Sequence, residues 1–132
     1  MRNKMTMGRS VIVAALLLLC GGSFALPTAA AETMTWRVKS TYKYKVQVAF
    51  YSQARKYEWP GGGDAYNLND SEMHEYPIRC EEDEKICFGG WVTGNAKKYW
   101  GVGYNNAHDC TNCCFICGGG EIPTQVLSEG DD

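Results

Sequence analysis

Histidine is scarce in this chain of 132 residues, which has two. Neither His74 nor His108 belongs to a Ser/His/acid arrangement, a zinc-protease helix or a cofactor-binding fingerprint. We therefore expect no catalytic residues and no cofactor, and we expect both histidines to be ordinary surface side chains.

A sustained helical period is also missing, which excludes a helical bundle and a βαβ fold. Residues 35–39 and 44–50 instead alternate apolar and polar side chains, as half-buried strands do. We predict that they form a hairpin through a link at 40–43, and that further strands lie at 75–80, 85–92 and 99–104. The expected fold is all-β: a small antiparallel β sandwich or open barrel stapled by disulfides.

Long hydrophobic runs are limited to residues 11–19, which is short of the roughly 20 residues that cross a bilayer as a helix. Arg2, Lys4 and Arg9 precede this run, and small residues fill positions 29–31. This pattern predicts a signal peptide at 1–31 that is cleaved after Ala31. Cys20 is then discarded, since Leu19 is not the small residue that a lipoprotein site requires. We expect a secreted or periplasmic protein with no transmembrane segment after cleavage.

A basic surplus is absent from the rest of the chain. Three of the 13 basic residues and none of the 15 acidic ones lie in the signal peptide, which leaves a net charge of −5. This balance argues against nucleic-acid binding. Bases gather at 37–56 and acids at 64–84, as two solvated faces or as a basic face for an anionic lipid or acidic polysaccharide.

The length predicts one domain, with a β-rich part at 32–120 and an acidic, mobile tail at 121–132. Residues 59–64 (WPGGGD) predict a turn and not a phosphate loop, since no helix pattern follows. Residues 67–72 lack the glycine and oxygen spacing of a calcium loop. The acids at 81–84 predict a solvated hairpin tip without catalytic carboxylates. The pair Gly89-Gly90 predicts a bulge or the close approach of another backbone.

Six cysteines follow the signal peptide, and an even set in an exported chain predicts three disulfides. Two arrangements remain open. In one, Cys80 and Cys87 face each other across the acidic tip, and two bridges form within 110–117. In the other, the 110–117 segment is tied back to that hairpin. The cysteines concerned are Cys80, Cys87, Cys110, Cys113, Cys114 and Cys117.

The rival interpretation of the same segment is a metal site. Cys110–Cys113 and Cys114–Cys117 are two C-x-x-C pairs, which a structural zinc site also uses. Such pairs usually lie on two separated knuckles, whereas these abut, so we predict disulfides and no bound metal. A thiol-redox or hydrolytic enzyme is a weaker alternative, because no strand-then-helix pattern surrounds the C-x-x-C.

Aromatic residues are abundant, with four tryptophans and eight tyrosines. We expect Trp36, Trp91 and Trp100 to lie mostly in the core. The residues beside the glycine turn are expected to be exposed and to form a ligand surface, in which aromatic rings stack on sugars or anchor a partner. This predicted ligand surface consists of Tyr57, Trp59 and Tyr66.

Several short motifs occur together in this chain: VQVAFYSQ at 46–53, WPG at 59–61, KICFGGW at 85–91, YWGVG at 99–103 and the C-x-x-C-C-x-x-C at 110–117. Together they resemble a group of small exported bacterial proteins of uncharacterised function. The resemblance spans nearly all of the chain after the signal peptide, and it implies no activity, cofactor or catalytic residue. The sequence thus predicts an exported, disulfide-stabilised binding or envelope-associated protein and not an enzyme. It does not identify the ligand, for which carbohydrate and an envelope component are the candidates.

Overall fold

The computed structural model describes residues 21–22 and 31–130 of the chain. The predicted signal peptide at 1–31, including Cys20, lies outside the described residues apart from Gly21, Gly22 and Ala31. Within the described ranges, no helix is long and apolar enough to cross a membrane.

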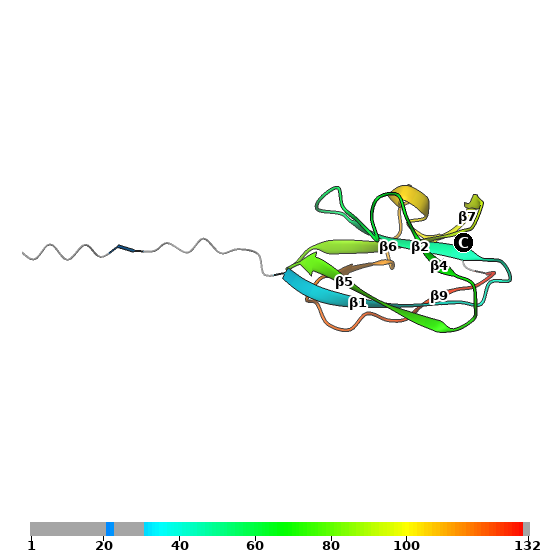
Figure 1. Ribbon diagram of the computed structural model, residues 1–132, viewed down its shortest axis with the longest axis horizontal. Helices are drawn as coiled ribbons and strands as arrows, with labels where there is room; N and C mark the ends of the chain where they lie inside the picture. The colour runs from blue at the N-terminus through cyan, green and yellow to red at the C-terminus, as the bar shows by residue number, and fades with distance from the viewer. Residues whose placement is uncertain (1–20, 23–30, 131–132) are drawn as a thin grey trace, which may run out of the picture.

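Two β-sheets stack as the layers of a sandwich, which confirms the predicted all-β fold (Figure 1). The smaller sheet has three strands in the order β5-β1-β9. Strands β1 and β5 pair antiparallel, and the short β9 pairs parallel to the end of β1. Its elements are β1 (Ala31–Ser40), β5 (Met73–Glu81) and β9 (Gln125–Leu127).

The larger sheet has six strands, with the order β3-β2-β6-β7 and with β4 paired to β2 and β8 to β6. All of these pairings are antiparallel. A short 3-10 helix, η1 (Tyr104–Asn106), follows β7. The strands are β2 (Val46–Ser52), β3 (Glu58–Trp59), β4 (Tyr66–Leu68), β6 (Lys85–Val92), β7 (Asn95–Gly101) and β8 (Cys114–Ile116).

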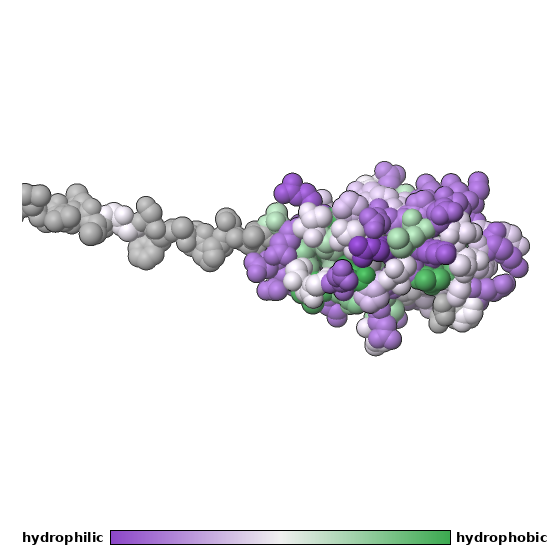
Figure 2. All heavy atoms as spheres, turned by 90° about the horizontal axis from the view of Figure 1, so that it is seen from below, coloured by the Kyte–Doolittle hydropathy of each residue, from purple (hydrophilic) through white to green (hydrophobic). Residues whose placement is uncertain are grey.

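Alternation along β1 directs one face of the strand to the core, as predicted for residues 35–39. Met34, Trp36 and Val38 are at most 5% exposed, whereas the residues between them reach solvent. On that outer face Arg37 pairs with Glu75 of β5, with Nε and Oε1 3.0 Å apart. On the face seen in Figure 2, the surface is mainly hydrophilic and apolar side chains form small, separate patches. The apolar side chains on the inner face of β1 are enclosed between the sheets.

Trp36 lies at the centre of this core and is fully buried. Its ring packs at 4.9 Å from that of Phe50, 6.4 Å from Phe88 and 5.5 Å from Phe115. The indole Nε1 has no hydrogen-bond partner within the described part of the chain. Aromatic rings are only weak hydrogen-bond acceptors, so burial of this N–H group costs free energy. The packing of Trp36 against the three phenylalanine rings offsets that cost. Trp91 and Trp100 are also buried, as predicted.

The predicted hairpin between the first two strands is wrong, because the link at 41–45 crosses from one sheet to the other. Strand β2 is buried on both faces beyond its second residue, from Val48 to Ser52. Such a strand needs neighbours on both sides and cover on both faces, so it takes a central place in the larger sheet. A second crossover follows β5, because the connection at 82–84 leads from β5 in the smaller sheet to β6 in the larger one.

The disulfide pattern follows from this second crossover. Cys80 and Cys87 lie on strands of different sheets, and each bonds to the 110–117 segment, so their predicted pairing is wrong. Three bridges form from six cysteines, as predicted. Of the two predicted arrangements, the one that ties the 110–117 segment back to the segment with Cys80 and Cys87 is closer to the observed bonds. The bonds are Cys80–Cys117, Cys87–Cys114 and Cys110–Cys113.

The predicted mobile tail is ordered within the described residues. Ile122 is 5% exposed and Leu127 is fully buried. The carbonyl of Leu127 accepts a hydrogen bond from the amide of Thr41 at 2.9 Å, and β9 pairs with β1. Sequence reasoning missed this strand because acidic residues flank a short apolar segment. The predicted last aromatic strand at 99–104 is also displaced, since β7 ends at Gly101.

Gly89 and Gly101 confirm the predicted close approach of backbones. A Cβ on Gly89 would lie 2.2 Å from the carbonyl oxygen of Gly103, and one on Gly101 would lie 2.1 Å from that of Phe88. Neither position has room for a side chain. The segment after β7 thereby packs directly on the outer face of β6.

We expect Gly89→Ala to lower the free energy of unfolding by about 3 kcal/mol, because the backbone of 102–103 has to move away. Urea unfolding followed by tryptophan fluorescence measures this loss. Gly130→Ala is the matched control, since no heavy atom lies within 4 Å of its Cβ. Equal stability of the two variants would contradict the packing described here.

We expect removal of the Cys87–Cys114 bridge, by Cys87→Ala with Cys114→Ala, to lower the melting temperature by at least about 10 °C. These residues are 27 apart in the sequence, and Cys110 and Cys113 are 3 apart. The chain-entropy model then gives roughly 3.5 kcal/mol for the longer loop and roughly 2 kcal/mol for the shorter one. Differential scanning calorimetry of both double variants tests this order, and a larger loss for Cys110→Ala with Cys113→Ala would overturn it.

Candidate functional site

The loop between β2 and β3 is folded tightly around Ser52. The Ser52 hydroxyl accepts hydrogen bonds from the amides of Ala54 at 3.2 Å and Arg55 at 3.1 Å. The Ser52 amide donates to the carbonyl of Tyr57 at 3.0 Å. A serine that bonds the amides two and three residues ahead stabilises a turn. The loop therefore holds Arg55 and Tyr57 in fixed positions.

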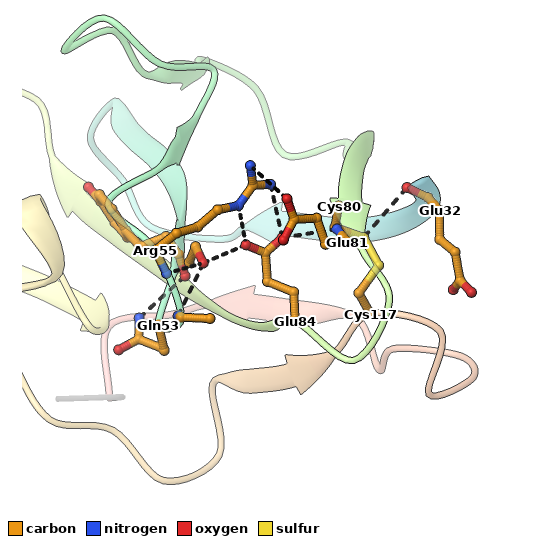
Figure 3. A network of polar contacts seen from close by, with 10 residues as sticks. Glu32, Gln53, Arg55, Cys80, Glu81, Glu84 and Cys117 are labelled. Atoms are coloured by element: carbon orange, nitrogen blue, oxygen red, sulfur yellow. Dashed lines mark hydrogen bonds and ion pairs between the residues drawn. A yellow bond between two sulfur atoms is a disulfide. The ribbon is translucent and has the colours of Figure 1, made fainter. Parts of the chain in front are cut away.

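A buried carboxylate, Glu84, accepts hydrogen bonds from this loop (Figure 3). Glu84 lies in the connection between β5 and β6. Its Oε2 accepts from Ser52 Oγ at 2.6 Å and from Arg55 Nε at 2.5 Å. Its Oε1 accepts from the second nitrogen of the guanidinium at 3.1 Å and from the amide of Glu81 at 3.1 Å. Both oxygens are thus satisfied. We call this set of contacts the Arg55–Glu84 latch.

The acids at 81–84 were expected to be a solvated tip, and for Glu84 that prediction is wrong, since it is 4% exposed. Burial by itself raises the pKa of the Glu84 carboxyl. The hydrogen bonds from Arg55, Ser52 and the Glu81 amide outweigh it, so the pKa lies below its ordinary value of 4.5. Glu84 is therefore ionised at neutral pH and is not available as a proton donor.

Arg55 also supports two aromatic rings. Its guanidinium carbon lies 4.4 Å from the centre of the Tyr57 ring and 5.7 Å from that of Trp59. The two rings meet edge to face, with centres 4.9 Å apart. Cation–π contacts and this edge contact fix the tyrosine while leaving it 51% exposed.

An open cleft of about 940 Å³ adjoins this loop. One wall is the 51–62 segment, and the other is η1. Gln53 and Asn106 join the walls through reciprocal amide hydrogen bonds of 3.2 and 3.4 Å. The lining residues are Tyr51, Ser52, Gln53, Ala54, Arg55, Lys56, Tyr57, Glu58, Pro60, Gly61, Gly62, Asn105 and Asn106.

Backbone geometry shapes both rims of the cleft. Gly61 and Gly62 have φ of 96° and 67°, and the amide of Asp64 donates to the carbonyl of Gly61 at 3.1 Å, so the predicted turn at 59–64 is confirmed. On the other rim the amide of Asn105 donates to the hydroxyl of Tyr51 at 3.0 Å. Burial raises the pKa of Tyr51 to about 12, so this hydroxyl remains neutral.

The structure separates the three residues of the predicted ligand surface. Tyr57 lines the cleft and is exposed as predicted. Trp59 is 7% exposed, so its predicted exposure is wrong; it supports Tyr57 from the core. Tyr66 lies away from the cleft on β4, where its ring packs 4.5 Å from Tyr76 and 6.0 Å from Phe50. Burial raises the pKa of Tyr66.

Sequence reasoning missed the residues that complete the site. These residues are Gln53, Asn105 and Asn106. The left-handed backbone of the two asparagines, with φ of 57° and 55°, is the one local signal, since asparagine tolerates that region better than other residues. Nothing local marks Glu84, because its partners Ser52 and Arg55 lie about 30 residues earlier in the chain.

Metal binding by the cysteine segment is not supported. All six cysteines have a disulfide partner, and no cluster of three or more metal-ligating side chains occurs among residues 21–22 and 31–130. The histidines have other contacts. His74 Nε2 is 2.7 Å from Asp70 Oδ1, and His108 stacks on Tyr99 with ring centres 3.7 Å apart.

No family model, no curated protein and no solved structure matches this chain. The resemblance to a group of small exported bacterial proteins therefore stays a prediction.

We expect the Arg55–Glu84 latch to stabilise the fold at neutral pH and to fail in acid. The pKa of Glu84 is lower in the folded protein than in the unfolded chain. The contribution of Glu84 to stability is therefore complete above its unfolded pKa, and it is lost as the pH falls through its folded pKa. Glu84→Gln should lower the free energy of unfolding at pH 7 by about 2–3 kcal/mol, below the range for a fully buried pair because Arg55 is partly exposed. Urea unfolding at pH 7 and from about pH 5 to about pH 3 measures both effects.

Glu82→Gln is the control for this experiment, because Glu82 is exposed in the same connection. It should unfold as the unaltered protein does at every pH. If Glu84→Gln instead has the same acid dependence as the unaltered protein, the latch is not the group that titrates.

Proposed function

We propose that the protein is an exported, disulfide-stabilised binding module whose ligand lies in the cleft between the 51–62 segment and η1. The observation that supports this most is an exposed tyrosine, Tyr57, that Arg55 holds in the same cleft as the paired amide side chains of Gln53 and Asn106. The cleft, at about 940 Å³, is of the size that small-ligand sites have, roughly 300–1,000 Å³.

We propose a neutral carbohydrate as the ligand class. Sugar rings present apolar C–H faces that stack on aromatic rings, and Tyr57 offers such a ring. Sugar hydroxyls both donate and accept, as do the amides of Gln53, Asn105 and Asn106. The charges of the lining favour a neutral ligand over a polyanion. Glu84 neutralises Arg55, and Lys56 is balanced by Glu58.

The latch supports this proposal by lowering the cost of binding. Ordering a loop and its side chains on ligand binding costs free energy, and a site that is already fixed avoids that cost. The Ser52 turn and the Arg55–Glu84 latch fix Tyr57 from below. The amide pair of Gln53 and Asn106 fixes the opposite rim.

Export is part of the proposal and is supported by two features. The first is the predicted signal peptide at 1–31. The second is the presence of three disulfides, which persist in oxidising compartments such as the periplasm or the extracellular space. A binder in that location meets glycans and other envelope components. For this cleft we propose binding and no catalysis, since both oxygens of the buried Glu84 are occupied by fixed donors.

A glycan-array screen of the purified domain, followed by calorimetric titration of the glycans retained, tests this function. We expect Tyr57→Ala to weaken binding by about tenfold or more, which corresponds to the loss of one stacking contact of about 1.4 kcal/mol. Tyr44→Ala is the matched control, since Tyr44 is 59% exposed and precedes β2, whereas Tyr57 follows it. It should bind as the unaltered protein does.

Two results would overturn the proposal. One is the absence of any retained glycan at millimolar concentration. The other is equal weakening by Tyr57→Ala and Tyr44→Ala, which would place the ligand outside the cleft.

A further inference from the structure

The Cys110–Cys113 bridge differs from the other two in what it holds together. Cys80–Cys117 and Cys87–Cys114 join segments that are 37 and 27 residues apart in the sequence. Cys110–Cys113 spans only three and connects no two elements of the sheets. Its closure therefore contributes least to the ordering of the fold.

Opening this bridge would leave the cysteine segment in place. The carbonyl of Cys113 accepts from the amide of Phe88 at 2.8 Å, and the amide of Cys117 donates to the carbonyl of Glu84 at 2.8 Å. Strand β8 remains paired with β6 and remains bonded through Cys87–Cys114. The bridge can thus open and close in the folded protein, as a local event.

The two sulfurs of this bridge have different surroundings. Cys113 is 3% exposed, whereas Cys110 is partly exposed and is followed by exposed Thr111 and Asn112. Cys110 also lines a small hollow of about 290 Å³, and Cys113 does not. An incoming thiolate therefore reaches Cys110, and Cys113 is the leaving group. The hollow is large enough for a cysteine side chain with part of its backbone.

The charges around the hollow are mixed. Lys85 lines it together with Cys110, and a cationic group stabilises an ionised sulfur. Asp109 lines it as well and acts in the opposite direction. The rest of the lining is mixed: Gln53, Asn106 and Thr111 are polar, Val102 is apolar, and Cys87 and Cys114 belong to the neighbouring bridge.

We propose that Cys110–Cys113 is an exchangeable disulfide that reacts with dithiol peptides at this hollow. A peptide thiolate attacks Cys110 Sγ, the Cys110–Cys113 bond breaks, and the electron pair leaves with Cys113, which takes up a proton. The second peptide thiolate then attacks the peptide sulfur of the mixed disulfide and releases Cys110. The peptide loses two electrons and gains a disulfide, and the protein gains two thiols. This activity goes beyond the proposed sugar binding and does not depend on it.

A reductant titration tests whether the bridge is exchangeable. The native domain is incubated with increasing dithiothreitol, alkylated, digested and analysed by mass spectrometry. We expect Cys110 and Cys113 to be alkylated while the other four cysteines stay bonded and the near-ultraviolet circular dichroism is retained. Reduction of all three bridges together, or the appearance of a free Cys87, would overturn the proposal. A free Cys87 would arise if the Cys113 thiolate attacked Cys114 and displaced Cys87, and Cys113 Sγ lies only 4.0 Å from Cys114 Sγ.

Single-cysteine variants test the direction of attack. Cys113→Ser leaves Cys110 with a free thiol, which should form a mixed disulfide with an oxidised peptide. Cys110→Ser should form this mixed disulfide at least about tenfold more slowly, because exchange requires access to the sulfur. A stability measurement on both variants excludes unfolding as the cause. Equal trapping rates, or trapping only by Cys110→Ser, would contradict the assignment of Cys110 as the attacked sulfur.

Discussion

The Cys80–Cys117 bond is the constraint on which the rest of this structure depends. Cys80 belongs to β5 of the smaller sheet, and Cys117 directly follows β8 of the larger one, so this bond joins the two layers. A three-stranded sheet in a domain of this size buries little surface, and such small domains gain from a covalent link. The Cys87–Cys114 bond lies inside the same loop and fixes β8 against β6.

The cross-linked end of the sandwich also positions the cleft. Glu84 lies in the connection between Cys80 and Cys87, so the bonds that hold the layers together also fix the carboxylate. Glu84 then holds Arg55 (Figure 3), and Arg55 packs on the ring of Tyr57. Stability and the geometry of the candidate site therefore share one chain of contacts. The proposed exchange at Cys110–Cys113 lies outside this chain of contacts, although its hollow shares Gln53 and Asn106 with the cleft.

Local patterns predicted the local features well. Alternation marked β1, the apolar run at 85–92 matched β6 in full, and Gly89 marked a close approach that the structure confirms. Hydrophobic alternation shows which face of a strand is buried. It does not show which other strand is its neighbour or which sheet it joins. The two crossovers, the burial of Trp59 and the ion pair of Glu84 were missed for this reason. Each depends on residues that are distant in the sequence.

The pairing of β1 with β9 has a consequence for how the chain reaches this fold. The first strand of the domain finds one of its two neighbours in the last one, almost ninety residues later (Figure 1). Contacts so distant in sequence slow folding, because a long segment has to be ordered before they form. Until Gln125–Leu127 has been synthesised, one edge of β1 stays unpaired, so the smaller sheet is completed late. A chain that closes late in this way stays open for longer, which suits the export proposed above.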